Sequence, residues 1–466
     1  MVHEDRNIMK VLFIRLRKNT DFNPVPHLGL GLLASVLKAQ GHDVKVLDYL
    51  LFLTSAEVPS IEDAINDFKP DIVGFSIYTA THLSSLKAIE RIARYRLPII
   101  VGGPHPTLYP EDMKSVPGIS YIVLGEAEDV IAGIVHNASY RERPEVIDGT
   151  KADMKKIAIP DFKSFYNWET ISQYPLQTSR GCPFNCSFCS VKYISSRLWR
   201  SRDVMLCVDE LELAKKEYPH LEYVKIVDDA PTIDIVRFKN FLKEYISRGI
   251  NLKMTIDNVR ADTIDEEFVA LAKAAGNGSL CVGVESGNEE VFKEVNKGET
   301  LDEVRRAARL IKMGGLSLGL CFVIGLPYDN LKRVHDSINL SKELQADFIF
   351  WNMVHPMERT GVMEWFKKNN ARIYDTRNYS SYDAPSLRVQ EPVVETRDFP
   401  RYSRKRAYFM AVVDTEQYPM TPRELFFLFS GAFKYRYIWG VTKAFSKKVY
   451  RKIKKVYKKS EKTVRL

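Results

Sequence analysis

Short, fully apolar runs alternate with amphipathic segments along the first 140 residues of the chain. The segment Leu28–Gln40 places apolar residues on one face at a helical spacing and stops before Gly41, so it predicts a helix. Fully apolar strands that alternate with helices are typical of a doubly wound parallel sheet whose two faces are both covered. We therefore expect an α/β, Rossmann-like fold here. Its strands are predicted at Val11–Leu16, Val44–Leu47, Ile72–Ser76, Ile99–Val101 and Tyr121–Leu124, with further helices around Ser60–Phe68 and Thr81–Tyr95.

A second series of strand-then-helix units follows and predicts a partial (β/α)6, TIM-like barrel. Chemistry in such barrels is built from the loops at the carboxyl ends of the strands. The barrel strands are predicted at Tyr174–Thr178, Tyr223–Val227, Lys253–Ile256, Leu280–Val284, Leu318–Ile324 and Phe348–Met353, with helices at Ile235–Arg248, Asp265–Ala275, Thr300–Met313 and Leu331–Leu344.

The C-terminal region loses this alternation. Residues 365–430 mix charges, tyrosines and prolines, and we expect a mainly helical cap. From Val441 onward, apolar residues recur at helical spacing with lysines and arginines between them, which predicts an amphipathic helix with Val441, Phe445, Val449, Ile453 and Val456 on its apolar face. The expected parts are a Rossmann-like domain (1–140), a linker (141–172), the barrel (173–364), the cap (365–430) and a basic tail (431–466).

The basic character of the chain is confined to this tail. The whole chain carries +9, while residues 431–466 hold thirteen lysines and arginines against one glutamate, so the tail carries +12 and the remainder sums to −3. The composition is otherwise that of an ordinary globular protein. The N-terminus has no apolar signal-peptide core, and no apolar run is long enough to cross a membrane, so we expect a cytoplasmic protein.

Three of the six cysteines lie in one short segment. Cys182, Cys186 and Cys189 follow a predicted strand in a C-x3-C-x2-C spacing. Three thiolates this close can ligate three irons of a [4Fe–4S] cluster and leave the fourth iron open for a small ligand. A zinc site usually shows paired C-x2-C units or a nearby histidine, and a disulfide scaffold usually belongs to a short secreted chain, so both fit less well. The other cysteines stand singly in apolar sequence and are expected to be buried small hydrophobes: Cys207, Cys281 and Cys321.

The form C-x3-C-x-aromatic-C, with Phe188 before the last cysteine, resembles the signature of the radical SAM superfamily. The resemblance implies that the open iron binds S-adenosylmethionine (SAM) and that an electron from the cluster cleaves SAM to a 5′-deoxyadenosyl radical. It also implies an external one-electron donor of the flavodoxin or ferredoxin type.

The ends of the predicted barrel strands extend this resemblance. Asp228-Asp229 matches the family motif that meets the SAM amino group, although adjacent acids are also common in solvated turns. Gly283–Gly287 (Gly-Val-Glu-Ser-Gly) resembles the ribose-binding motif, and Ile324–Pro327 resembles the segment that packs on the adenine. Arg260 matches a basic residue that neutralises the SAM carboxylate, and an ion pair with Asp262 is the alternative explanation. The resemblance thus implies SAM contacts by Phe188, Asp228, Asp229, Arg260, Gly283, Glu285, Ser286, Ile324 and Gly325.

After the last barrel strand, the family commonly has a P-x-P-G-T turn that faces the substrate. This chain reads His355-Pro-Met-Glu-Arg-Thr-Gly361 and keeps only parts of that turn. His355, Glu358 and Arg359 are the candidate substrate contacts, and the divergence leaves the substrate undefined.

Small and polar residues cluster at the predicted strand ends of the first domain, where ligands of open parallel sheets bind. Three stretches, at residues 73–76, 101–107 and 124–128, together resemble the cobalamin-binding domain that precedes many radical SAM cores. The alternative is a retained scaffold that binds nothing. The resemblance implies cobalamin contacts by Ser76, Thr79, Gly102, Gly103, His105, Gly125 and Glu126.

One part of the cobalamin resemblance is missing. Cobalamin domains that use a histidine as the lower cobalt ligand carry D-x-H-x-x-G, and this motif is absent, although the radical SAM branch often binds cobalamin without it. The histidines of this region are expected at surface or loop positions: His27, His42, His82 and His105.

These features predict a cobalamin-dependent radical SAM enzyme that methylates an unactivated carbon of an apolar, lipid or tetrapyrrole-like substrate. Radical cyclisation or rearrangement is the alternative. An RNA-modifying methylthiotransferase is disfavoured because residues 1–181 contain no cysteine for a second cluster. A non-catalytic iron–sulfur or cobalamin sensor would not need the SAM motifs.

The basic tail admits three interpretations. Aromatic residues beside a basic amphipathic helix favour an anionic membrane surface, with the protein peripheral at the inner face of the membrane. Electrostatic RNA binding and a merely solubilising end are the alternatives, and nucleic acid is not the expected partner.

Overall fold

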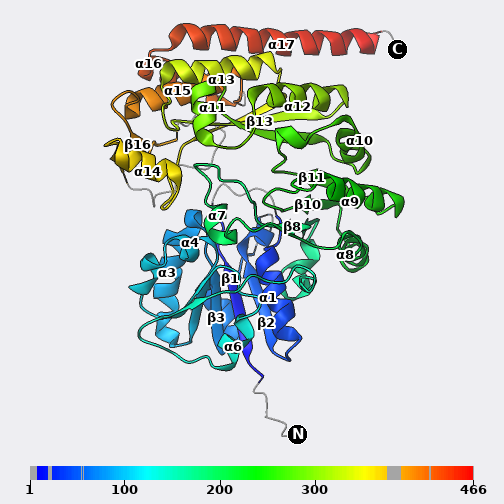
Figure 1. Cartoon of the computed structure of the whole chain (residues 1–466), viewed down its shortest axis with the longest axis vertical. Helices are drawn as coiled ribbons and strands as arrows, with labels where there is room; N and C mark the ends of the chain where they lie inside the picture. Colours follow the sequence, from blue (N-terminus) through cyan, green and yellow to red (C-terminus); the bar gives the residue numbers. More distant parts are fainter. Residues whose placement is uncertain are drawn as a thin grey trace. The chain divides into compact units, whose positions relative to one another are not determined.

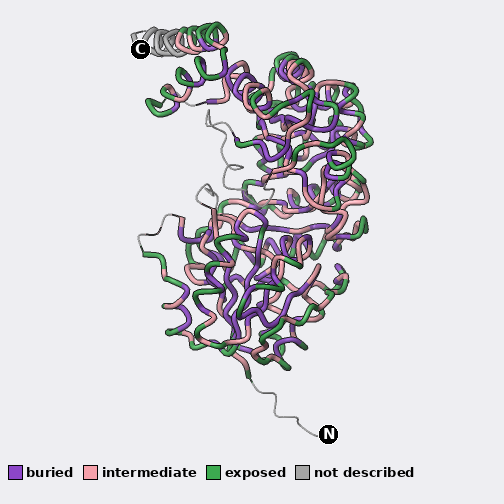
Figure 2. Tube along the Cα trace, turned by 90° about the vertical axis from the view of Figure 1, so that its left-hand side faces the viewer, coloured by how far each residue is buried: buried purple, intermediate pink, exposed green. Residues whose placement is uncertain are grey.

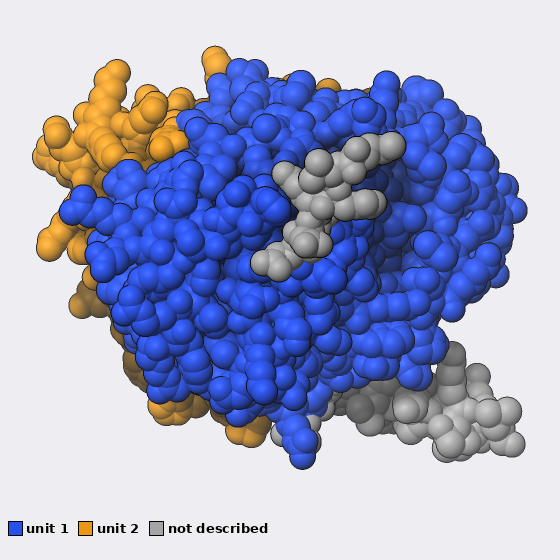
Figure 3. All heavy atoms as spheres, turned by 90° about the horizontal axis from the view of Figure 1, so that it is seen from below, with its two compact units in different colours: residues 1–185, 189–280 blue, residues 186–188, 281–466 orange. Residues whose placement is uncertain are grey.

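The structure, a computed structural model, describes residues 8–18, 24–53, 55, 57–374, 390–418 and 421–464, without the side chains of residues 452–464. The chain divides into two compact units, shown in blue and orange in Figure 3. Unit 1 comprises residues 1–185 and 189–280, and unit 2 comprises residues 186–188 and 281–466.

Unit 1 begins with a six-stranded parallel sheet in the order β2-β1-β3-β4-β5-β6 (Figure 1). Strands β1 to β5 are largely buried (Figure 2), because the fold covers both faces of the sheet. The predicted doubly wound sheet is therefore confirmed. Strand β6 was not predicted; it lies in the expected linker and pairs with β5. The strands are β1 Lys10–Arg15, β2 Asp43–Asp48, β3 Ile72–Ser76, β4 Ile99–Gly102, β5 Ile119–Leu124 and β6 Glu145–Asp148.

Alternate residues of these strands face opposite layers of the domain. Leu12, Val73 and Val101 join a buried cluster with residues of α2 and α3. Phe13 and Ile100 instead line a cavity together with residues of α1. Side chains of a strand alternate between the two faces, so one face builds the core and the other is left for a ligand. The helices are α1 Leu28–Lys38, α2 Ile61–Phe68, α3 His82–Ile92, α4 Pro104–Leu108, α5 Glu111–Lys114 and α6 Ile131–His136.

A second parallel sheet of unit 1 has the order β11-β10-β7. Its strands are close to the first three strands predicted for the barrel, and α9 and α10 were also predicted, whereas α8 was missed. A short antiparallel pair, β8 with β9, flanks the cysteine segment. The elements are β7 Gln173–Leu176, β8 Ser179–Arg180, α7 Val191–Ser195, β9 Arg200–Ser201, α8 Val204–Glu217, β10 Tyr223–Ile226, α9 Ile235–Ser247, β11 Lys253–Ile256 and α10 Glu266–Ala274.

Unit 2 contains the other predicted barrel strands as a three-stranded sheet, β12-β13-β14. Its two faces differ in burial. Phe322 and Trp351 stack with ring centroids 4.6 Å apart on the buried face, whereas Cys321 and Phe350, which are register partners, lie on the less buried face. The elements are β12 Ser279–Glu285, α11 Glu289–Val295, α12 Leu301–Met313, β13 Ser317–Ile324, α13 Leu331–Glu343 and β14 Phe348–Met353.

The C-terminal region of unit 2 is mainly helical, as predicted. Helix α15 packs against α13, β14 and α17, and α16 packs against α17. Val441 is only 1% exposed, so the expectation that the apolar face of the tail lies on a membrane is wrong at this position; Ile453 and Val456 lie outside the described side chains. The elements are α14 Gly361–Lys368, β15 Arg372–Ile373, β16 Val394–Glu395, α15 Arg401–Asp414, α16 Pro422–Lys434 and α17 Ile438–Val464.

Within the described residues, no helix combines the length and the apolar character that crossing a bilayer requires.

Candidate functional site

A cavity of about 580 Å³ is formed in unit 1 by α1 and the carboxyl ends of the first sheet's strands. Apolar residues such as Phe13, Leu30 and Val123 line it together with polar residues such as Glu128 and Asp229. Of the residues predicted to contact cobalamin, Ser76, Gly102, Gly103, Gly125 and Glu126 line this cavity, whereas Thr79 and His105 do not.

Glycines let the backbone itself form part of the cavity wall. Gly103 has a φ of +102°, and a Cβ there would lie 3.1 Å from the backbone of Ile77. A Cβ at Gly74 would lie 2.5 Å from the Phe13 ring, whereas one at Gly125 would meet no atom within 4 Å. Residues 74 and 103 therefore need glycine, and Gly125, which borders open space, favours glycine because its φ is +79°. A cavity lined by both apolar and polar side chains fits a large, mainly uncharged ligand such as cobalamin.

His27 is a residue of this cavity that sequence reasoning missed. It caps α1, because its Nδ1 accepts a hydrogen bond from Leu30 N at 3.1 Å. Burial and the charge of Arg15 lower the pKa of His27 to about 3, so the imidazole is neutral at pH 7. With Nδ1 occupied as an acceptor, the ring proton is on Nε2, which donates to Ser76 Oγ at 2.8 Å. A histidine directly before an apolar helix was the available sequence signal.

Two other histidines contradict the expected surface or loop positions. His105 is fully buried and His82 is 2% exposed. Their rings stack at 4.4 Å, and His105 also stacks on Tyr109 at 5.0 Å. His105 is thus packed inside the domain, because the short helix α4 turns it away from the cavity that the neighbouring glycines line.

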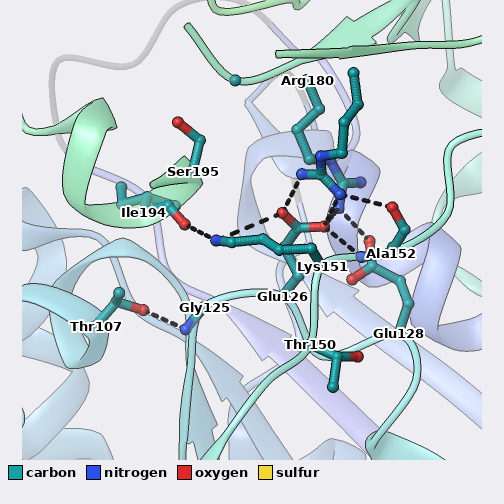
Figure 4. Close-up of polar contacts among 12 residues, drawn as sticks. Thr107, Gly125, Glu126, Glu128, Thr150, Lys151, Ala152, Arg180, Ile194 and Ser195 are labelled. Carbon is teal, nitrogen blue, oxygen red and sulfur yellow. Dashed lines mark hydrogen bonds and ion pairs between the residues drawn. The ribbon is translucent and has the colours of Figure 1, made fainter. Parts of the chain in front are cut away.

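Glu126 lies at the centre of a charged network within unit 1 (Figure 4). Its carboxylate accepts a hydrogen bond from Arg180 Nη1 at 2.8 Å and from Ala152 N at 3.0 Å, and it pairs with Arg200. Burial raises the pKa of Glu126, but the hydrogen bond from Arg200 and the charge of Arg180 outweigh it, so the pKa is below its ordinary value. Glu128 also pairs with Arg180, at 2.8 Å. The first domain therefore holds the strand that leads into the cysteine segment.

Two acidic residues after β10 fix the backbone in front of the cysteines. Asp228 is 1% exposed, and its carboxylate accepts hydrogen bonds from Thr178 N and Thr178 Oγ1, both at 2.7 Å, and from Ser179 Oγ at 2.5 Å. Asp229 accepts from Gly181 N at 2.8 Å. Burial raises the pKa of Asp228 to about 6. The structure thus gives Asp228 a positioning role, while Asp229 also lines the cavity.

The cysteine segment itself is compatible with a cluster. Cys182, Cys186 and Cys189 are half-buried, and none of the chain's six cysteines forms a disulfide. Among the described residues, no three His, Cys, Asp or Glu side chains converge closely enough to hold a single metal ion. A cubane cluster gives each thiolate its own iron, so its ligands need not converge on one point. The chemistry of this donor set fits the predicted cluster.

Arg260 supports the same segment from the loop after β11. Its guanidinium pairs with both carboxylate oxygens of Asp262, at 3.0 and 2.7 Å, and lies 3.5 Å from the centre of the Phe184 ring. Arg260 is 5% exposed. The ion pair with Asp262, which was the alternative explanation for Arg260, is therefore present. It orients the arginine against the Phe184 ring of the cysteine segment.

In unit 2, Glu285 and Lys297 form a buried charged group near Cys186. Lys297 Nζ donates to Gly283 O, lies 3.0 Å from Glu299 and lies 3.8 Å from Glu285. Burial lowers the pKa of Lys297, but Glu285 and Glu299 outweigh it and raise the pKa above its usual value, with a smaller contribution from Cys186. Lys297 was not predicted, because a lysine in a polar stretch gives no distinctive signal.

Residues of the predicted ribose motif are tightly constrained. Glu285 has a φ of +66°, a strained value for a residue other than glycine, and burial raises the pKa of its carboxyl. A Cβ at Gly283 would lie 2.7 Å from Glu285 Oε1. Ser286 is buried, and its Oγ accepts a hydrogen bond from Asn288 N at 3.2 Å. Phe188 packs on the cluster that includes Val291 and Leu326.

The predicted adenine segment is held by a residue from the C-terminal region. Gly325 has a φ of +90° and donates its N–H to Asp329 Oδ2 at 2.7 Å. Its carbonyl accepts from Arg404 Nη1 at 2.9 Å, and Ile324 O accepts from Val354 N at 2.8 Å. Burial lowers the pKa of Arg404 to about 10 and raises that of Asp329 to about 6. These backbone groups are therefore already hydrogen-bonded within unit 2.

Two cysteines outside the motif do not stand singly, as was expected. Cys281 on β12 and Cys321 on β13 lie with their Sγ atoms 3.3 Å apart, and both are half-buried. Adjacent strands of one sheet bring together residues that are forty positions apart, which local sequence cannot show. Cys207 is fully buried, as predicted.

The predicted substrate residues lie in the turn before α14. Glu358 pairs with Lys367 at 2.9 Å, and Arg359 is exposed with a φ of +65°. His355 is half-buried. Their role as substrate contacts remains a prediction.

Comparison with known proteins gives two family matches. The model described as B12 binding domain matches residues 16–135, and the model of the radical SAM superfamily matches residues 176–341. The chain is 27% identical over 399 residues to "Uncharacterized methyltransferase PH0819" of Pyrococcus horikoshii, covering 80% of this chain and 84% of that protein. It is 27% identical over 409 residues to the anaerobic magnesium-protoporphyrin IX monomethyl ester cyclase of Rubrivivax gelatinosus, covering 80% and 72%.

The fold is also that of a solved structure. The radical S-adenosylmethionine methyltransferase TsrM from Kitasatospora setae, solved with cobalamin and a [4Fe–4S] cluster bound, has a TM-score of 0.59 at 17% sequence identity. The match covers 76% of this chain and 77% of that chain. The predicted architecture is thereby confirmed.

Proposed function

This chain belongs to the radical SAM enzymes that carry a B12-binding domain, and from this premise we propose that it methylates an unactivated carbon of an apolar substrate, such as a lipid or a tetrapyrrole. The enzyme uses a [4Fe–4S] cluster, SAM and cobalamin, and it needs an external electron donor and a small-molecule substrate. The observation that carries the proposal is the cavity at the strand ends of the B12-binding domain, in a chain where Glu126 pairs with Arg180 of β8, the strand that leads into the cysteine segment.

The chain's residues would position the groups that react. When bound, the cluster and SAM supply a radical that removes a hydrogen atom from the substrate carbon, and cobalamin supplies the methyl group. In this proposal, Cys182, Cys186 and Cys189 hold the cluster, and Lys297 places a positive charge beside Cys186. Glu285, held in its strained conformation, accepts hydrogen bonds from the SAM ribose.

Radical cyclisation or rearrangement without methyl transfer is the second candidate. It is supported by the similarity to the ester cyclase, whose identity equals that of the methyltransferase relative. The two candidates share the radical-forming step and differ in the fate of the SAM methyl group, so a labelled methyl group separates them.

The experiment begins with protein purified without oxygen from cells supplied with cobalamin. We expect about four irons and about one cobalamin per chain, and cleavage of SAM to 5′-deoxyadenosine after reduction. Cys186→Ala should abolish the cleavage, whereas Cys207→Ala, a buried cysteine outside the segment, should retain it. Cleavage that survives in the Cys186→Ala protein contradicts the mechanism.

The second stage follows SAM that carries a deuterated methyl group, incubated with lipid and pigment extracts. Label in an extracted molecule supports methylation. Formation of 5′-deoxyadenosine without transfer of the label supports cyclisation or rearrangement. Purified protein that contains iron but no cobalamin would indicate that the first domain is only a scaffold.

The proposal includes a cytoplasmic location with peripheral contact to the inner face of the membrane. The net charge of +12 on residues 431–466 supports this location, because the inner leaflet is anionic. An apolar substrate dissolved in the bilayer would then be within reach of the enzyme.

A further inference from the structure

We infer that α16 and the first turns of α17 form a surface that lies in the headgroup region of an anionic phospholipid bilayer. This inference deepens the proposed action on an apolar substrate, although vesicle binding can be measured without turnover. The surface differs from the one expected from sequence, because the apolar side of α17 at Val441 and Ala444 is buried within unit 2.

The surface consists of large aromatic side chains that the fold leaves outside. Phe426, Phe429 and Phe433 of α16 are 69%, 45% and 71% exposed, and Trp439 at the start of α17 is 80% exposed. The three phenylalanines span only about 60° of the helix circumference, at 100° per residue, so they form one stripe. Isolated exposed apolar residues are common, whereas a stripe of this kind marks an interaction site.

The opposite side of α16 is already used by the protein. Glu424, Leu428, Gly431 and Ala432 are buried, and they face away from the aromatic stripe on the helix circumference. A Cβ at Gly431 would lie 2.3 Å from the Phe409 ring, so α16 is closely packed on α15 along this side. The helix therefore has two apolar sides and only one of them is buried within unit 2.

Positive charges border the stripe. Arg423 and Lys434 lie beside it on α16, and Arg436 and Lys443 follow on the turn and on α17; all four are exposed. Among the described residues, no acidic side chain lies within 4 Å of these four cations, whereas Lys447 and Arg451 farther along pair with Glu416. Cations with no acidic neighbour are available to anionic headgroups, each adding to the attraction.

Phenylalanine and tryptophan next to lysine and arginine are the side chains that favour the boundary between headgroups and acyl chains. Binding to RNA would depend mainly on cations and would not require a stripe of phenylalanines. Binding to a soluble protein partner would not require the excess positive charge of the tail. The combination therefore points to an anionic lipid surface. RNA binding becomes an outcome of the test.

The test is co-sedimentation of the full-length protein with vesicles of phosphatidylcholine alone or with about 30% of the anionic lipid phosphatidylglycerol added. We expect binding to the anionic vesicles, weakened by salt. The triple variant Phe426→Ser, Phe433→Ser, Trp439→Ser should bind at least about tenfold more weakly. A charge variant, Arg423→Gln with Lys434→Gln, should lose binding to anionic vesicles and keep its thermal stability.

The matched control is Val236→Ser with Met313→Ser, which removes two residues that are 66% and 73% exposed on other helices. This variant should bind vesicles as the wild type does. Equal sedimentation of the triple variant and the wild type overturns the inference, and so does binding to RNA with none to vesicles. SAM cleavage measured on the same samples keeps a failure of the proposed chemistry distinct from a failure of this surface.

Discussion

At the scale of single residues, buried polar side chains in this protein are fixed by backbone groups. His27 accepts from Leu30 N, Asp228 accepts from Thr178 N and Arg404 donates to Gly325 O. Each of these side chains satisfies a backbone group that would otherwise be buried without a partner, which costs about 1–3 kcal/mol. Their types were visible in the sequence, but their partners were not, because Asp228 and Arg404 reach residues 50 and 79 positions away.

His27 makes stability depend on pH. Its folded pKa of about 3 lies below the value of 6.5 expected in the unfolded chain. The stability that its neutral form contributes is therefore present above pH 6.5 and lost as the pH falls, by up to about 1.4 kcal/mol per pH unit. We expect His27→Asn, which can still cap α1, to lose less stability between pH 6.5 and pH 5 than the wild type does.

Urea unfolding at pH 5.0, 5.75 and 6.5 measures this difference. His136→Asn, which changes an exposed histidine of α6, is the control and should follow the wild type. Parallel pH profiles for wild type and His27→Asn would show that the burial of His27 does not perturb its titration.

At the scale of elements, the C-terminal helix α15 completes the barrel region. Arg404 is 1% exposed, donates to Gly325 O and Phe399 O at 2.9 Å each, and lies over the Phe399 ring at 4.9 Å. Gly325 lies at the end of β13, so the helix fixes the turn after this strand. The turn and the helix are expected to unfold together.

Arg404→Met should therefore destabilise unit 2 by about 2–4 kcal/mol, because two buried carbonyl groups lose their donor. Arg309→Met, which changes an exposed arginine of α12, should cost less than about 0.5 kcal/mol. Urea unfolding followed by circular dichroism compares the two variants, and equal midpoints would contradict the role given to Arg404.

Most elements could be predicted from local periodicity. β3, β11 and β14 have the predicted bounds, because apolar runs between turn residues define strands well. β6 was missed because its burial is low and it has no apolar run, and α8 was missed because its apolar residues are mixed with charges. The sequence motifs located the cysteine segment and five cavity residues, but not His27 or Lys297, whose importance comes from burial and from partners that only the fold brings together.

At the scale of the whole molecule, the Glu126 network connects parts of unit 1 that are distant in sequence. Glu126 follows β5, while Arg180 and Arg200 lie on the antiparallel pair β8 and β9 beside the cysteine segment. Their side chains are 7%, 14% and 15% exposed, so the pairing is shielded from water. The end of β5 and the pair β8 and β9, which flanks the cysteine segment, are thereby held together within unit 1.

Glu126→Gln removes the buried negative charge that pairs with both arginines. We expect it to lower the free energy of unfolding by about 3 kcal/mol. We expect the thermal unfolding midpoint to fall by about 5–10 °C and cobalamin binding to weaken, because Glu126 also lines the cavity. Glu142→Gln, which changes an exposed glutamate, is the control and should alter neither property. An unchanged midpoint in Glu126→Gln would show that the network contributes little.

The sixth strand of the first sheet has a consequence for where the molecule can be divided. β6 covers the edge of β5 from Tyr121 to Leu124, and its residues lie beyond position 140. A fragment that stops at residue 140 would expose the hydrogen-bonding groups of a long apolar strand, which is a template for aggregation. A fragment that keeps residues through Asp148 retains its own protective edge. The C-terminal limit of any fragment of the first sheet is thus set by the pairing of one short, polar strand.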